Sequence, residues 1–369
     1  MRAAVVRRPS GPFVVEELRV PSPGPGEILV RVAACGVCHT DLHVHAGSVP
    51  FPFPCVLGHE ISGTIVEAGA DVDDLAAGDR VVGAFIMPCG TCAQCAAGRE
   101  ELCEPFFAFN RQRGTLYDGT TRLFDADGQP VAMYSMGGLS EYAVLPARGA
   151  ARLTPDLPLA DACVLGCALL TAYGATHTVG ALRAGETVAV IGAGGVGGAI
   201  MQVARAAGAG TIVAVDVGAD KLEAARRCGA THTVDASALD AVAEVRELTG
   251  GRGADAVFEA VGHPATFRQA TEMAADGGRC VMVGIAPAGR LGEIEITRLV
   301  RRKLQVLGSF GGRPRASLPE LMAMVADGRL ALDGLISRRF ALEEADDAYR
   351  ALADGRIVGR AVIEMAADA

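Results

Sequence analysis

Four cysteines lie close together in the stretch PCGTCAQCAAGREELC, with the spacing C-x2-C-x2-C-x7-C. Short gaps let the first three thiolates surround one ion, and the helical-looking segment AAGREEL brings the fourth back to it. Tetrahedral zinc suits four thiolates and leaves no open coordination position, so such a zinc is structural. Iron–sulfur ligation and chance remain alternatives, although the ferredoxin run ends in C-x3-C-P. The predicted ligands are Cys89, Cys92, Cys95 and Cys103.

A second set of metal-binding residue types is dispersed along the chain. Cys38 lies in GVCHTDLH, His59 and Glu60 lie in LGHEISG, and Cys167 lies in LGCALLTAYGA. Two thiolates and one imidazole are the ligands of a catalytic zinc whose fourth position is left to water or substrate. Taken singly, each residue is weak evidence, because a lone cysteine is usually a buried apolar residue and a lone histidine is more often structural. The spacing alone therefore does not establish a second zinc site, which remains a hypothesis from the sequence.

The third chemical signal is glycine-rich. An apolar run over 188–191 leads into Gly192, Gly194 and Gly197, and the next apolar run ends at Asp216. A G-x-G-x-x-G between a strand and a helix lets the backbone approach a pyrophosphate, which the helix N-terminus binds. An acidic residue at the end of the second strand accepts from the ribose 2′-hydroxyl and repels a 2′-phosphate. The motif predicts a site for NAD rather than NADP, and a glycine-rich turn without a ligand is the alternative.

The elements that position these residues divide into two kinds. From 169 to 309, apolar strand-like runs alternate with helical patterns, which predicts an α/β domain with a doubly wound parallel sheet. Residues 1–168 contain many short β-type runs broken by glycine and proline, and 310–369 add two helical patterns and the strand-like RAVIEM. We therefore expect a β-rich domain that is interrupted by the nucleotide domain.

Charge and composition exclude several classes of partner. The chain has 369 residues and a net charge of −9, which argues against binding to a phosphate backbone. The N-terminal apolar run is too short for a signal peptide, and we expect no membrane span. A cytoplasmic location follows, where thiols stay reduced and clustered cysteines bind metals rather than form disulfides. Five further cysteines are expected to be buried thiols: Cys35, Cys55, Cys163, Cys228 and Cys280.

Taken together, these motifs resemble the zinc-containing medium-chain alcohol dehydrogenases, almost end to end. GVCHTDLH, LGHE, the four-cysteine segment and the glycine motif with Asp216 occur in the family's order. The segment RGTLYDGTTRL (113–123) resembles the longer subgroup of plant and animal enzymes. The resemblance implies a GroES-like catalytic domain with both zinc ions, a Rossmann coenzyme domain, and an active site between them.

The resemblance also implies a mechanism. Zinc would act as a Lewis acid on an alcohol oxygen, and hydride would pass to the nicotinamide of NAD. Thr40 and His43 match the family's proton relay, Asp41 matches the carboxylate that orients His59, and Glu60 matches a carboxylate behind the zinc.

Further positions match coenzyme contacts in the family. His39 and Arg360 match pyrophosphate contacts and Lys221 a ribose contact, although arginine is usual where His39 stands. A mostly neutral histidine should hold the pyrophosphate less tightly than arginine. The positions that match nicotinamide contacts are Thr171, Val196, Val283 and Ile285. Ordinary packing is the alternative for Thr171 and Val196.

The matched substrate pocket indicates a small-molecule alcohol or aldehyde with an apolar or aromatic body. Enzymes that oxidise thiol–aldehyde adducts place charged residues where this chain has Val49 and Phe107, but Arg111 or Arg113 could bind an anionic tail. A dehydrogenase for thiol–aldehyde adducts is the alternative, and a non-catalytic zinc- and nucleotide-binding protein is a remote one. The long segment after Cys103 favours a homodimer. The pocket is expected to be lined by Val49, Phe85, Phe107, Met133, Tyr134 and Ile285.

Overall fold

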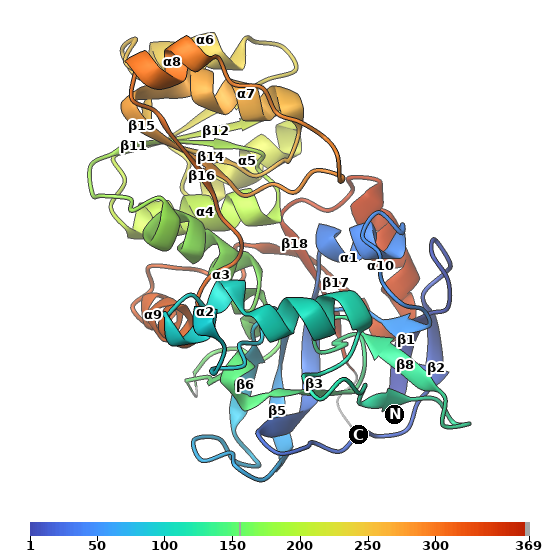
Figure 1. Cartoon of the computed structure of the whole chain (residues 1–369). Helices are drawn as coiled ribbons and strands as arrows, with labels where there is room; N and C mark the ends of the chain where they lie inside the picture. Colours follow the sequence, from blue (N-terminus) through green and yellow to red (C-terminus); the bar gives the residue numbers. More distant parts are fainter. Residues whose placement is uncertain (155, 366–369) are drawn as a thin grey trace. The chain divides into compact units, whose positions relative to one another are not determined.

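The computed structural model describes residues 1–154 and 156–365, which form two compact units (Figure 1). The first unit contains Met1–Leu170, Arg313–Ala323 and the chain from Ile336 onward, and the second contains Thr171–Gly312 and Met324–Leu335. The sequence pattern predicts that residues 310–369 belong to the β-rich domain. Met324–Leu335 instead groups with the second unit, where Gln202 exchanges two hydrogen bonds of 3.2 and 3.1 Å with the backbone of Ala331.

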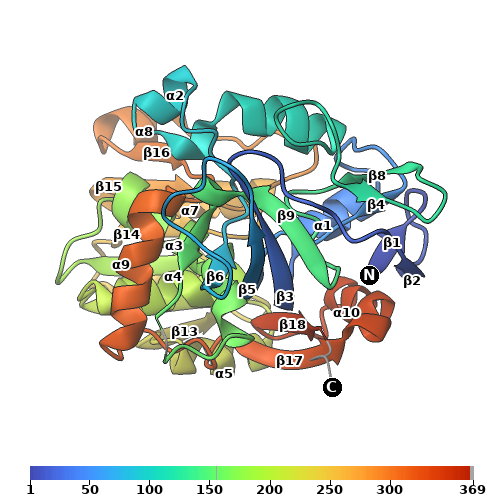
Figure 2. The ribbon, with the colours of Figure 1, turned by 90° about the horizontal axis from the view of Figure 1, so that it is seen from below.

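The larger sheet of the first unit has seven strands in the order β10-β6-β5-β3-β18-β17, with β9 also paired to β3. Its long strand β3 (Glu27–Val37) is mostly buried, because the apolar run EILVRVAACGV pairs with neighbours on both edges. Figure 2 shows β3, β5, β6 and β9 side by side. The other strands are β5 (Ile61–Ala68), β6 (Arg80–Gly83), β9 (Tyr142–Pro146), β10 (Ala150–Arg152), β17 (Ile336–Ala341) and β18 (Arg360–Glu364).

A second sheet of the first unit has five short strands in the order β2-β1-β4-β8-β7. The strands are β1 (Arg2–Val6), β2 (Val14–Glu17), β4 (Cys55–Val56), β7 (Leu123–Phe124) and β8 (Pro130–Met133). The segments between strands carry the helices α1 (His39–His45), α2 (Ala93–Ala96), α3 (Ala168–Tyr173), α9 (Pro314–Ala326) and α10 (Ala345–Ala353). Two of these helices, α3 and α9, continue into the second unit.

The second unit is built on a six-stranded parallel sheet with the order β13-β12-β11-β14-β15-β16. Numbered within the unit, this is the 3-2-1-4-5-6 order of dinucleotide-binding folds. The strands are β11 (Thr187–Ile191), β12 (Thr211–Asp216), β13 (His232–Asp235), β14 (Ala254–Glu259), β15 (Ala274–Met282) and β16 (Gln305–Gly308). The helices are α4 (Gly195–Ala206), α5 (Ala219–Arg227), α6 (Ala241–Leu248), α7 (Pro264–Met273) and α8 (Ile296–Arg301). The predicted α/β fold class is confirmed.

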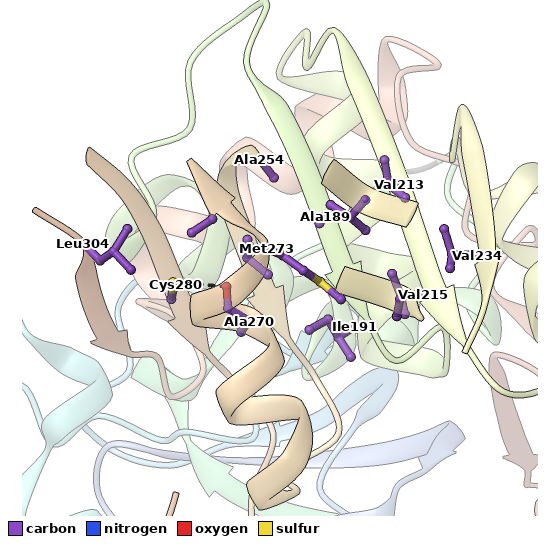
Figure 3. Packing of buried hydrophobic residues seen from close by; sticks show 14 residues of the cluster. Ala189, Ile191, Val213, Val215, Val234, Ala254, Ala270, Met273, Cys280 and Leu304 are labelled. Atoms are coloured by element: carbon purple, nitrogen blue, oxygen red, sulfur yellow. Dashed lines mark hydrogen bonds between the residues drawn. The ribbon is translucent and has the colours of Figure 1, made fainter. Parts of the chain in front are cut away.

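The core of the second unit consists of small and β-branched side chains (Figure 3). Ile191, Val213 and Val215 are buried on neighbouring strands, as expected for parallel strands covered on both faces. Cys280 lies in the same cluster, and its thiol donates to the carbonyl of Ala270 over 3.5 Å. All five cysteines that were expected to be buried thiols are buried.

One helical segment, Asp161–Val179, is long and apolar enough to cross a membrane by length and composition. In its most apolar window, however, 78% is buried inside the protein. The segment therefore behaves as a core helix that carries Cys167.

Candidate metal centres and active site

Cys38, His59 and Cys167 come together in the first unit. One donor atom from each lies within 4.8 Å of the others, and all three residues are buried. Each stands where a regular element begins or ends: Cys38 directly follows β3, His59 lies between β4 and β5, and Cys167 directly precedes α3. Two soft sulfurs and one imidazole fit zinc, and three protein ligands leave a fourth position open.

Asp41 on α1 fixes the orientation of His59. Its Oδ1 accepts from His59 Nδ1 over 2.9 Å and from Gly58 N over 3.2 Å, and its Oδ2 accepts from Tyr349 Oη over 2.7 Å. Burial lowers the pKa of His59, but Asp41 and Cys38 reverse this and raise it to about 10. The bond at Nδ1 leaves Nε2 as the ring atom free to bind a metal. Tyr349 has no local sequence signal, since 308 positions separate it from Asp41.

Glu60 and Arg360 lie against the same ligand set. Glu60 Oε1 accepts from Ala168 N over 2.9 Å, and Oε2 lies 3.4 Å from an Arg360 nitrogen. The same Arg360 nitrogen, Nη2, lies 3.6 Å from Cys167 Sγ. Burial raises the pKa of Glu60 to about 7 against the opposing effect of Arg360. A Cβ on Gly36 would stand 2.2 Å from Glu60 Oε2, so any larger residue there would require the Glu60 side chain to move.

The residues matched to the proton relay share helix α1. Thr40 Oγ1 lies 3.6 Å from Cys38 Sγ, which places the hydroxyl beside the ligand set. His43 follows three positions later, on the same face of the helix, and is half-buried. His39 is exposed at the start of α1.

Two aromatic rings stand next to His59. The ring centres of Phe85 and Tyr134 lie 5.9 and 6.0 Å from the imidazole, both at steep angles to it. Met133 is fully buried beside Tyr134 in the chain. Phe107 and Val49 are half-buried; Phe107 packs edge to face with Phe106, and Val49 N bonds to the carbonyl of His43.

The four-cysteine segment also converges. One sulfur each from Cys89, Cys92, Cys95 and Cys103 lies within 4.8 Å of the others. Cys89 Sγ accepts from the backbone N–H of Thr91 and of Cys92 over 3.4 and 3.3 Å. Burial raises the pKa of Cys89, but these N–H groups lower it to about 6. Four thiolates with a preformed N–H cradle fit a closed zinc site.

In the second unit, the glycine motif turns the chain from β11 into α4. Gly192 has φ +93°, and a Cβ on Gly197 would stand 1.8 Å from the Gly192 carbonyl oxygen. Gly194 is the N-cap of α4, and a Cβ there would meet nothing within 4 Å. Asp216 ends β12, and its carboxylate accepts from Ala193 N over 2.7 Å.

The remaining residues matched to coenzyme contacts in this unit come from α3, α4, α5 and the segment after β15. Thr171 is buried on α3, Val196 is half-buried on α4, and Lys221 is half-buried on α5. Val283 directly follows β15 and bonds to the Glu259 carbonyl, whereas Ile285 is 47% exposed.

Comparison with known proteins identifies the family. The model described as "Alcohol dehydrogenase GroES-like domain" matches residues 24–156, and the model described as "Zinc-binding dehydrogenase" matches residues 195–327. The chain is a zinc-containing medium-chain alcohol dehydrogenase family member. The predicted family is therefore confirmed.

Relatives of this alcohol dehydrogenase family member span its whole length. S-(hydroxymethyl)glutathione dehydrogenase of Escherichia coli is 35% identical over 97% of this chain and 98% of its own. The structure of benzyl alcohol dehydrogenase from Acinetobacter calcoaceticus has a TM-score of 0.93 at 30% identity and covers 99% of both chains. A structure from Sinorhizobium meliloti that is bound to NADP has a TM-score of 0.82 at 32% identity and covers 98% of both chains.

Proposed function

We propose that this protein is a zinc-dependent, NAD-linked alcohol dehydrogenase that interconverts primary alcohols with an apolar or aromatic body and their aldehydes. The observation that carries the proposal is the buried convergence of Cys38, His59 and Cys167 beside the rings of Phe85 and Tyr134. In this proposal the first unit is the catalytic domain with both zinc sites, and the second unit binds NAD.

The chain's own residues have separate tasks. Zinc at the three ligands would supply a Lewis acid that lowers the pKa of the alcohol, and NAD would supply the hydride acceptor. Thr40 accepts the alcohol proton and His43, one turn along α1, passes it toward solvent. Asp41 holds the tautomer of His59 that leaves Nε2 free. The four-cysteine site would bind a second, structural zinc.

The preference for NAD rests on Asp216. A carboxylate at the end of the second strand accepts from a ribose 2′-hydroxyl and repels a 2′-phosphate. The NADP-bound neighbour shows that a relative with the same fold accommodates NADP, so the two coenzymes must be compared directly. Lys221, His39, Arg360 and the glycine motif would bind the rest of the coenzyme.

The preference for apolar substrates rests on the pocket residues. Each methylene placed against such walls contributes about 0.8 kcal/mol, so kcat/KM should rise with chain length over the first few carbons. The relative named S-(hydroxymethyl)glutathione dehydrogenase supports the thiol-adduct alternative. The apolar Val49 and Phe107 argue against that alternative, because they offer no partner to a charged carrier.

A panel of alcohols and aldehydes with NAD and NADP tests the proposal. Hexanol and benzyl alcohol should be oxidised with NAD, and more efficiently than the glutathione adduct of formaldehyde. The opposite order would establish the alternative, and no turnover of any alcohol by zinc-loaded protein would refute both. We also propose that the protein is a homodimer in the cytoplasm. The reducing cytoplasm would keep the free cysteines as thiols, and light scattering can test the dimer.

A further inference from the structure

Arg111 has an unusual environment for a charged side chain. It ends the helical turn η2 (Phe106–Arg111) of the first unit. Its guanidinium carbon lies 4.1 Å from the ring centre of Tyr134, 4.9 Å from that of Phe106 and 5.7 Å from that of Phe85. Both terminal nitrogens are buried, and neither has a hydrogen-bond partner within residues 1–154 and 156–365. Three aromatic rings therefore surround a cation for which the described residues provide no ion pair.

In this arrangement, the free-energy cost of removing the guanidinium from water is only partly offset. Buried guanidinium groups are normally paired, because leaving water without a compensating anion is costly. Attraction to the ring faces offsets part of that cost. Arg360 shows the usual solution in the same unit, since its guanidinium is buried next to the Glu60 carboxylate. A carboxylate from outside the chain would complete the environment of Arg111 in the same way.

The position of Arg111 connects it to the reaction site. The ring centre of Tyr134 lies 4.1 Å from the guanidinium carbon of Arg111 and 6.0 Å from the imidazole centre of His59. These two separations limit the distance from guanidinium carbon to imidazole centre to about 10 Å. An extended chain covers about 1.2 Å per bond, so a chain of up to about eight carbons spans this distance.

We propose that Arg111 binds the carboxylate of the substrate, and that the preferred substrates are hydroxy acids and aldehyde acids with an apolar chain or ring between the two functional groups. This inference rests on the proposed function, and adds a charged end to the apolar body. The planar guanidinium can donate two parallel hydrogen bonds to a carboxylate, which an ammonium group cannot do. Because rings enclose the nitrogens, the carboxylate reaches them by displacing ring edges, and side-chain changes of this kind are common on binding.

The test compares matched substrates in the zinc-loaded full-length protein with NAD. The pairs are 6-hydroxyhexanoate with 1-hexanol, and 4-(hydroxymethyl)benzoate with benzyl alcohol. We expect kcat/KM to be at least about tenfold higher for the acid of each pair, the scale of a hydrogen bond to a charged group. In Arg111→Met the kcat/KM ratio of acid to neutral alcohol should fall to about one, and Arg111→Lys should retain only part of the preference for the acid. The control is Arg113→Met, which removes an exposed arginine stacked on Phe109 and should leave the ratio unchanged.

Binding of hexanoate, measured by calorimetry, separates this inference from the proposed function. Hexanoate should bind the unmodified protein and the Arg113→Met variant, and bind at least about tenfold more weakly to Arg111→Met. If no alcohol is oxidised, the proposed function fails while the calorimetry still decides the role of Arg111. Preference for both neutral alcohols in the unmodified protein would overturn the inference, even if Arg111→Met does not fold. Equal hexanoate affinity in the Arg111→Met and Arg113→Met variants would also overturn the inference.

Discussion

Tyr349→Phe should weaken both the fold of the first unit and its hold on the catalytic metal. The substitution removes one hydroxyl, which donates to Asp41 Oδ2 over 2.7 Å between residues that are 2% and 0% exposed. The ring stays, and with it the parallel stack on Phe13 at 4.5 Å. Packing is therefore preserved while one oxygen of a buried carboxylate loses its donor.

The expected loss in free energy of unfolding is about 1.5–3 kcal/mol, the range for hydrogen bonds to charged groups. The remaining contacts of Asp41, with Gly58 N and His59 Nδ1, both use Oδ1. With Oδ2 unpaired, the carboxylate is less firmly placed and His59 is less well oriented. Zinc should therefore bind about 10- to 100-fold more weakly, as for other partners of metal ligands.

Urea unfolding of zinc-loaded protein, followed by near-ultraviolet circular dichroism, measures the first effect. The signal reports mainly on the first unit, since the chain has no tryptophan and every tyrosine except Tyr173 lies there. Equilibrium competition for zinc with a chromogenic chelator measures the second effect. Tyr142→Phe is the matched control, because the Tyr142 hydroxyl makes no hydrogen bond in the described part of the chain. A Tyr349→Phe variant that matches this control in both assays would refute the reasoning.

Three other predictions address the metal and coenzyme sites. Purified protein should contain two zinc ions per chain. Cys103→Ser should lose one zinc and unfold readily, because a structural zinc contributes folding free energy. Cys167→Ser should lose the other zinc and all turnover, but remain folded by circular dichroism. Asp216→Gly should raise the kcat/KM ratio of NADP to NAD at least about tenfold, and an unchanged ratio would remove Asp216 from the ribose site. Gly36→Ala should destabilise the protein by about 1–3 kcal/mol in urea, because the new methyl group would stand 2.2 Å from Glu60 Oε2; unaltered stability would show that Glu60 moves freely.

Features that depend only on neighbouring residues could be predicted from the sequence. The four cysteines lie within fifteen positions of chain, so their spacing alone limits them to one small volume. The glycine motif likewise depends on a single strand, turn and helix, and Gly192 and Gly197 have the conformation and close contact that such a turn requires. Alternating strand and helix patterns were enough to predict the parallel sheet of the second unit, because each strand there is a short buried apolar run.

Features whose partners come from distant parts of the chain became apparent only in the folded protein. Tyr349 reaches Asp41 across 308 positions, and neither residue carries a local pattern that predicts the contact. Arg111 was only a possible contact for an anionic tail until folding placed its guanidinium among rings from three segments. Likewise, the association of Met324–Leu335 with the second unit depends on Gln202, more than a hundred residues earlier. Hydrogen bonding and burial select these partners in three dimensions, and spacing along the sequence does not record that selection.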